Sequence, residues 1–345
     1  MGSRRINCAC RREAFSLVEM LMTVAILGIL MSFVLSLLVQ SRLLIGATNR
    51  QADRLLQGMQ ILDQLSLRLS TATLNSRPAY FNPEAEIFLR SVVDTSANVV
   101  LAEEATISFV TGPSAQILGG QVASNPGDCI CWATPQTQPG ITGAGEFAQS
   151  LVGQVCMIYF GPDPESTGVS RPRYRYRLVL VTEPAESMRT LMRSTNFQWY
   201  REQFTDGPNG VVPANAQVLA ENVVALLVAP LDASGRRLAG MTVYDSWDWL
   251  LPAEFESPGA QTSFNRLPAA LEIGVVSIPG NTADRLAEQF GAVPPLGEAL
   301  EGLSAQTDWE QALLEVQNGF NPPVDFQFYQ GIVRLDRNNL TVAAP

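Results

Sequence analysis

Hydrophobic and polar residues follow three different patterns along this chain. Residues 20–39 contain no charged residue, and this length matches the roughly 20 residues with which a helix crosses a bilayer. Between residues 55 and 69, leucine and methionine recur at helical spacing among charged residues, which is typical of an amphipathic helix. Proline first occurs at Pro78, so both stretches are predicted to form one helix over residues 15–74.

Beyond a helix exit at residues 75–82, runs rich in β-branched and aromatic residues predict strands. These strands are expected at residues 155–160, 174–182, 223–230, 269–278 and 326–335. An insert of short helices is expected at residues 282–319, and a segment rich in Gly, Ser, Pro and Gln predicts a surface loop at 111–150. The expected fold class is α+β. A long N-terminal helix, membrane-spanning over about residues 15–39, packs its second half on antiparallel β-sheet in a globular β-rich domain at 80–345.

The types of basic residue restrict which catalytic and metal-binding sites this chain can form. All 23 are arginine, and the chain contains no histidine. This composition removes Schiff-base and P-loop lysines, histidine bases and histidine metal ligands. The net charge of −10 opposes nucleic-acid binding, because phosphates require a basic patch. We therefore expect a protein that is not an enzyme, that has no cofactor and that binds no nucleic acid.

Charge also orients the N-terminus. Arg4, Arg5, Arg11 and Arg12 lie before the apolar stretch, and basic residues that flank a spanning helix remain on the cytoplasmic side. The expected protein is a single-pass protein of the bacterial inner membrane, with a cytoplasmic N-terminus and an extracytoplasmic, periplasmic body.

Two plainer interpretations of this segment are a secretory signal peptide and a signal anchor without an assembly role. The apolar run is longer than the ~7–15 residues of a signal-peptide core, and no clear small-x-small cleavage site follows it. Both kinds of segment function best without an acid, yet Glu19 lies just inside the run. A carboxylate near the head of a spanning helix is by default a functional residue.

The string AFSLVEMLMTVAILGIL at residues 14–30 resembles the N-terminus of type IV pilin-like proteins, that is, prepilins and pseudopilins. The resemblance implies that a prepilin peptidase removes a leader, residues 1–14, between Ala14 and Phe15 and methylates the new amino group of Phe15. It also implies that Glu19, the fifth mature residue, pairs with the terminal amine of a neighbouring subunit during assembly. The family usually has glycine at the position of Ala14.

Small residues are grouped along the apolar helix. Ala25, Gly28, Ser32 and Ser36 follow one another at spacings that place them on one helix face. Such faces allow helices to approach closely in lipid, although small residues are also common in spanning helices generally. We predict a helix-packing face at these four positions.

The body carries a second resemblance. The segment VLAENVV at residues 218–224 is followed by Trp247 and Trp249 and then by LPAALEI at residues 267–273. This order looks like that of J-type minor pseudopilins of type II secretion, and it also resembles the Verru/Chthon cassette protein C family. The chain length and the helical insert after the second segment favour the cassette family.

The five cysteines divide between leader and body. Cys8 and Cys10 would leave with the leader, whereas Cys129, Cys131 and Cys156 remain in a compartment where disulfides persist. Their spacing is too sparse for a zinc site. A disulfide from Cys156 to Cys129 or Cys131, pinning the loop, is the favoured expectation.

Three further segments contain residues that could bind a ligand. Residues 173–177 alternate arginine with tyrosine, and neighbouring acids explain them better than single-stranded nucleic acid. Residues 245–248 could hold calcium, as in some pseudopilins, but lack the oxygen-rich alternation of a calcium loop, which favours a solvated hairpin. Residues 232–235 read as a turn.

Together these features predict a structural subunit: a minor pilin-like or pseudopilin-like protein of a type IV pilus or a type II secretion-like envelope assembly. The expected partners are prepilin peptidase, other pilin-like subunits and the inner membrane. The alternative is a membrane-anchored periplasmic binding module with no filament role, which would use the cysteine-bearing loop to hold a ligand.

Overall fold

The structure is a computed structural model. It describes residues 17–74, 76–82, 87–89, 100–105, 108–119, 127–136, 150–162, 173–184, 187–188, 199–201, 216–238, 243–246, 267–291, 295–300, 302–320 and 322–335. The chain divides into two units, Met1–Gln57 and Gly58–Pro345, which are described separately.

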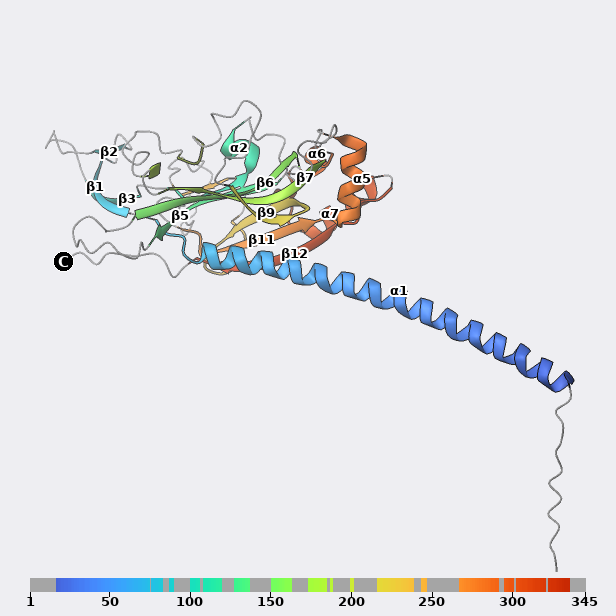
Figure 1. Ribbon diagram of the computed structural model, residues 1–345. Coiled ribbons are helices and arrows are strands. Elements are labelled where there is room, and N and C mark those ends of the chain that lie inside the picture. Colours follow the sequence, from blue (N-terminus) through green and yellow to red (C-terminus); the bar gives the residue numbers. More distant parts are fainter. Residues whose placement is uncertain are drawn as a thin grey trace, which may run out of the picture. The chain divides into compact units, whose positions relative to one another are not determined.

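One helix, α1 (Leu17–Leu69), runs for 53 residues and begins in the first unit (Figure 1). The absence of proline and the run of apolar residues favour this unbroken helix. Its predicted end at residue 74 is too late. Residues 70–74 leave the helix because Thr73 donates its backbone N–H to the Ala133 carbonyl at 2.9 Å and so joins a strand of the body.

The body contains a six-stranded sheet in the order β10-β4-β5-β6-β7-β8. Its strands are β4 (Val110–Pro113), β5 (Asp128–Gln136), β6 (Ser150–Pro162), β7 (Tyr174–Glu183), β8 (Ala216–Glu221) and β10 (Tyr244–Asp245). Every neighbouring pair is antiparallel. Strands β4 to β8 lie in the sheet in the same order as in the chain, so each pairs with the strand that follows it.

A second sheet has the order β12-β11-β9, with β9 (Val223–Leu231), β11 (Ala270–Ser277) and β12 (Gln327–Arg334). All positions of β9 are buried, in keeping with its continuous apolar run. Both sheets are antiparallel and the chain begins with a long helix, so the predicted α+β class is confirmed. A third sheet joins β1 (Ser76–Asn82), β2 (Ile87–Leu89) and β3 (Val100–Ala105) in the order β2-β1-β3.

The side chains of the six-stranded sheet alternate between two hydrophobic clusters. Ile130, Trp132 and Ile158 belong to the larger cluster, which also holds the second sheet and the Ile61, Leu65 and Leu69 side chains of α1. The smaller cluster contains the intervening residues of the same strands together with α2 (Ser114–Leu118), Met188, Trp199 and Tyr200. Only the C-terminal part of the amphipathic stretch is buried in the larger cluster, since Leu55, Leu56 and Met59 are exposed, so its spacing predicts the buried face only in part.

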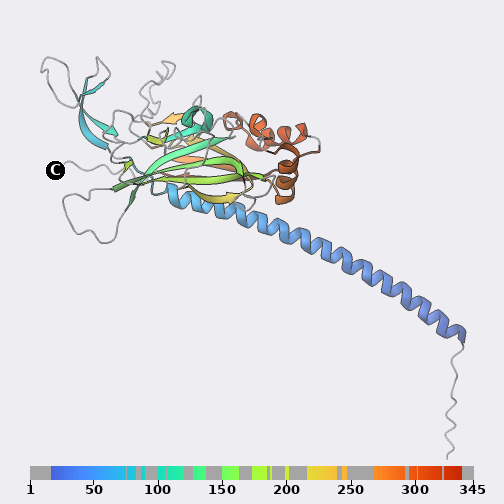
Figure 2. The same cartoon turned by 45° about the horizontal axis from the view of Figure 1, so that its top comes forward.

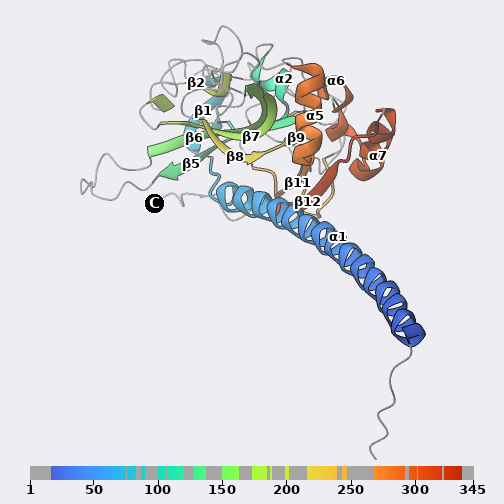
Figure 3. The ribbon, with the colours of Figure 1, turned by 45° about the vertical axis from the view of Figure 1, so that its right-hand side comes forward.

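Four short helical segments gather at one end of the body, coloured orange to red in Figures 1, 2 and 3. They are α5 (Gly280–Phe290), α6 (Gly297–Leu300), the 3-10 helix η3 (Leu303–Ala305) and α7 (Trp309–Gly319). All lie between β11 and β12 in the chain, in the region where the helical insert 282–319 is expected.

The expected loop at residues 111–150 is wrong where the structure describes it, at residues 111–119 and 127–136. Most of β4, all of α2 and all of β5 lie within it, and β5 is the third strand of the large sheet. The strand was hidden because Asp128 and Pro135 are residue types that strands usually avoid and because Gly, Ser and Gln surround it. Its cysteines thus belong to a buried central strand.

Candidate functional site

The N-terminal part of α1 is the first candidate site. Ala14 and Phe15, the expected cleavage and methylation residues, lie outside the described residues. The helix is described from Leu17, and Glu19 stands in its first turn with its side chain exposed. An acid at this position is favourable for the helix itself, because the N-terminal end of the macrodipole is positive.

The next turn carries a polar residue whose hydrogen bonds stay within the helix. The Thr23 hydroxyl donates to the backbone carbonyls of Met20 at 2.9 Å and Glu19 at 3.0 Å. A threonine that bonds back to its own helix needs no outside partner in an apolar environment.

Within the part of the chain that the structure describes, one helical segment is long and apolar enough to cross a membrane. It spans Leu17–Arg42, 26 residues with a mean hydropathy of 2.6, and no part of its most apolar stretch is buried in the protein. A helix at the centre of a soluble domain would be buried, so this segment fits a single-pass membrane anchor. A signal sequence near an N-terminus can meet the same criterion of length and hydropathy.

The proposed packing face is open. Ala25, Gly28, Ser32 and Ser36 are all exposed on α1. A Cβ added to Gly28 would meet no atom within 4 Å. No described residue covers these four positions, and their role in helix packing stays a prediction.

The three body cysteines are free and buried, so the expected disulfide is not formed. The reason is the register of the sheet, in which Cys156 on β6 lies opposite Ile130 on β5. Because neighbours of Ile130 point to the other face of the sheet, Cys129 and Cys131 lie in the smaller cluster and Cys156 in the larger one. A bond between them would have to pass through the sheet.

Burial also makes two of these thiols, those of Cys131 and Cys156, unreactive. It raises the pKa of Cys156 and of Cys131 above the ordinary thiol value, and the neighbouring Cys129 raises the pKa of Cys131 further. A thiol with a raised pKa forms little thiolate, the reactive form. Cysteines of this kind are suited to packing.

The arginine-tyrosine stripe on β7 is paired with acids, as expected. Arg177 is buried and donates from Nε to both carboxylate oxygens of Glu221, at 2.9 and 3.0 Å. Arg175 pairs with Asp284 of α5 at 2.6 Å. Tyr176 points into the core, where its hydroxyl accepts the Leu296 N–H at 3.1 Å and burial raises its pKa. These contacts explain the stripe without a bound nucleic acid.

The segment VLAENVV forms the corner at which the chain leaves one sheet for the other. Asn222 adopts a left-handed conformation, with φ of 59°. Its N–H donates to the Tyr176 carbonyl in the first sheet at 2.8 Å, and its carbonyl accepts the N–H of Ile278, which follows β11, at 3.0 Å. Asparagine tolerates this conformation better than most residues, which gives the motif a structural role.

The two candidate turns have structural roles in the described residues. The Ser246 hydroxyl is buried and accepts the Phe109 N–H at 2.8 Å, while Trp247, Asp248 and Trp249 lie outside the described residues. At the other turn, Asp232 accepts the N–H groups of Ser234 and Arg236, and these bonds hold the pKa of its carboxyl below the usual value. Neither contact requires a cation.

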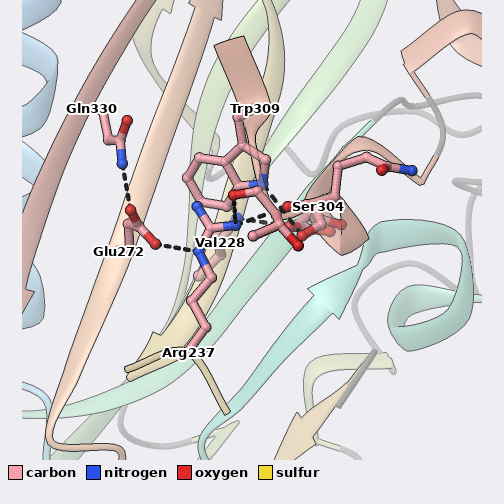
Figure 4. A network of polar contacts seen from close by, with 9 residues as sticks. Val228, Arg237, Glu272, Ser304, Trp309 and Gln330 are labelled. Carbon is pink, nitrogen blue, oxygen red and sulfur yellow. Dashed lines mark hydrogen bonds and ion pairs between the residues drawn. The ribbon is translucent and has the colours of Figure 1, made fainter. Parts of the chain in front are cut away.

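A polar network that the sequence did not reveal lies beside the helical insert (Figure 4). Arg237 donates to Glu272 at 2.5 Å, to the Gln306 and Thr307 carbonyls, and lies 4.1 Å from the ring centre of Trp309. Gln330 donates to the other oxygen of Glu272. The network thus connects the turn that follows β9 with β11, β12 and the helical insert. Its members are far apart in sequence, so no local pattern could have grouped them.

Comparison with known proteins adds one finding. The family described as prokaryotic N-terminal methylation motif matches residues 10–35. No curated protein and no solved structure matches the chain. The resemblance of the body to J-type pseudopilins and to the cassette family therefore stays a prediction. The match covers the expected cleavage position, Glu19 and most of the apolar helix, so the chain carries the N-terminal methylation motif of type IV pilin-like proteins on a long helix that leads into an α+β body.

Proposed function

We propose that this protein is a structural subunit, a minor pilin-like or pseudopilin-like component of a type IV pilus or a type II secretion-like envelope assembly. The observation that carries the proposal is the methylation motif at residues 10–35, placed over an exposed apolar helix of spanning length. The motif implies processing by a prepilin peptidase and assembly with other pilin-like subunits. The protein acts as a component of an assembly and catalyses no reaction in this proposal.

The position of Glu19 supports assembly over anchoring alone. A carboxylate inside a bilayer costs at least ~2.5–3.5 kcal/mol unless a partner or water relieves it. A simple anchor gains nothing from that cost. In an assembly, the terminal ammonium of an adjacent subunit would relieve it, so the acid favours joining. The arginines before the helix support a cytoplasmic N-terminus in the inner membrane and an extracytoplasmic body.

The alternative, a periplasmic binding module, loses its main support. It relied on a surface loop that carried Cys129 and Cys131, and these residues lie instead in the buried strand β5. Among the described residues, no group of three or more potential metal ligands is present to suggest another bound ion.

The test is the mature N-terminus. In a host that contains prepilin peptidase, mass spectrometry of the purified protein should show a chain that begins with N-methylated Phe15. Ala14→Glu should abolish the cut, because the peptidase requires a small residue before the bond. A chain that begins at Met1 or beyond residue 39 in such a host would rule the proposal out.

A further inference from the structure

The most unusual buried group of the body is the carboxyl of Asp128, the first residue of β5. Its side chain is 1% exposed. Its Oδ2 atom accepts the backbone N–H of Val228 on β9 at 2.7 Å, and its carboxyl also forms a hydrogen bond with the Ser304 side chain in η3. One carboxyl group thus joins the six-stranded sheet, the three-stranded sheet and the helical insert, around the Val228 and Ser304 positions labelled in Figure 4.

The neighbouring glycine makes this contact possible. Gly127 has a φ of 83°, and a Cβ at this position would lie 2.7 Å from the Leu226 carbonyl oxygen. The backbone of β5 can therefore approach β9 closely. Because β9 is an edge strand of its sheet, its outward N–H groups require acceptors other than a strand. Asp128 supplies the acceptor for Val228.

The surroundings of Asp128 hold no opposite charge among the described residues of the adjoining elements. Strands β4 and β9, helix α2 and η3 contain no charged residue. In the nearby polar network, the charge of Arg237 is balanced by that of Glu272, to which it is bound. Asp308 caps α7 by accepting the Gln311 N–H. Burial raises the pKa of Asp128 to about 7, while its bonds to Val228 and Ser304 oppose the rise.

We propose that Asp128 is a proton-operated latch, which fastens β5 to β9 and η3 when its carboxyl is neutral and loosens this seam when it ionises. The neutral acid can accept from Val228 and donate to the Ser304 oxygen, so that all three groups are satisfied. Ionisation places an uncompensated charge in an apolar core, and the seam must open or admit water to stabilise it.

The direction of the effect follows from linkage. The folded-state pKa of about 7 lies above the ordinary value of 3.8. The stabilising contribution is therefore fully present below pH 3.8 and is lost as the pH rises to about 7. Above that pH the folded protein carries the charge, and the seam is at its weakest.

Hydrogen exchange of the full-length protein in detergent micelles tests the latch. Exchange is measured by mass spectrometry from pH 5.5 to 8.5 and divided by the intrinsic chemical rate at each pH. Peptides that contain Val228 or Ser304 should exchange about tenfold faster at high pH than at low pH, with a midpoint near 7. In Asp128→Asn the carboxamide reproduces the hydrogen bonds of the neutral acid, so exchange should stay at the low-pH level throughout.

Asp232→Asn is the matched control. It removes the same charge from an exposed turn where the pKa is lowered, so it should retain the wild-type profile. A flat wild-type profile, or an equal rise in Asp128→Asn, would overturn the proposal. Should Asp128→Asn fail to fold, Ser304→Ala decides. Loss of the Ser304 bond raises the pKa of Asp128 further, so the midpoint should move to higher pH, and an unmoved midpoint contradicts the latch.

Discussion

Gly58 of α1 lies directly against the ring of Tyr329 on β12. A Cβ built on Gly58 would be 2.4 Å from the Cγ and Cδ1 atoms of that ring. Both residues belong to the second unit of the chain, and Gly58 is its first residue. The absence of a side chain thus allows the body-bound part of the helix to reach the sheet.

We expect Gly58→Ala to destabilise the body. The new methyl group forces the Tyr329 ring to move, at a cost of about 1–3 kcal/mol for an overpacked site. The gain in helix propensity, about 1 kcal/mol, offsets only part of this cost. The urea-unfolding midpoint of the full-length protein in detergent should fall accordingly.

Gly319→Ala is the control for this change. Gly319 is the last residue of α7, and a Cβ there meets no atom within 4 Å. It should leave the midpoint unchanged or raise it slightly. If Gly58→Ala and Gly319→Ala behave alike, the close approach to Tyr329 is not a determinant of stability.

The cysteines of the exported protein should remain three separate thiols. Cys156 faces the larger cluster while Cys129 and Cys131 face the smaller one, so no rotamer brings Cys156 to either of them. Peptide mapping without reductant should recover the Cys156 peptide unlinked, and reductant should leave the thermal unfolding temperature unchanged. A linked Cys156 peptide would show that the register of β5 and β6 differs from the one described here.

The ion pair between Arg177 and Glu221 should be asymmetric under mutation. The Arg177 side chain is 4% exposed and that of Glu221 is 48% exposed. Glu221→Gln leaves a buried cation without its counter-ion, whereas Arg177→Met leaves an acid that water can solvate. We expect Glu221→Gln to cost about 2 kcal/mol, below the ~3–5 kcal/mol of fully buried pairs because water reaches one partner.

Urea unfolding of both single variants and of the double variant measures this asymmetry. Arg177→Met should cost less than Glu221→Gln, and the double variant should cost less than the two single costs combined. Additive costs would mean that the two side chains do not interact in solution.

Local sequence patterns predict much of the secondary structure. The spacing of leucines predicted the buried side of α1 at Leu65 and Leu69 but not at the exposed Leu55 and Leu56. The runs of β-branched residues coincide with β6, β7, β9, β11 and β12. Strand β5 was missed because its ends carry Asp128 and Pro135, and the aspartate is there for a contact with β9. The sequence alone does not show that Asp128 is buried, because its burial depends on how the two sheets pack together.

The residues of the candidate sites also differ in whether the sequence alone can predict them. The N-terminal motif is contiguous, so Glu19 and the boundary at Ala14 and Phe15 could be named from the sequence, and residues 10–35 match the methylation motif. The pairing of Arg177 with Glu221 and of Arg237 with Glu272 depends on strand register and on the helical insert. Register is decided by long-range packing, which no local window contains.

Glu19 separates assembly from anchoring, and Glu19→Leu is the decisive change. Removal of the carboxylate relieves a cost of at least ~2.5–3.5 kcal/mol in lipid, so the variant should insert into the membrane as well as the wild type or better. Cleavage before Phe15 should continue. Crosslinking in membranes of the native host should lose the adducts with other subunits, because a neighbouring terminal ammonium no longer has an acid to pair with.

The control is Thr23→Val, one helical turn further along α1. The Thr23 hydroxyl bonds only to carbonyls of its own helix in the described contacts, so its removal should leave insertion and crosslinking unchanged. If Glu19→Leu gives the same adducts as Thr23→Val, Glu19 is not a pairing group and the segment is a plain anchor. A subunit at the tip of a filament has one adjacent subunit fewer than a shaft subunit. A loss of some adducts while others persist would therefore place this protein at an end of the assembly, with Glu19 still acting as the pairing acid.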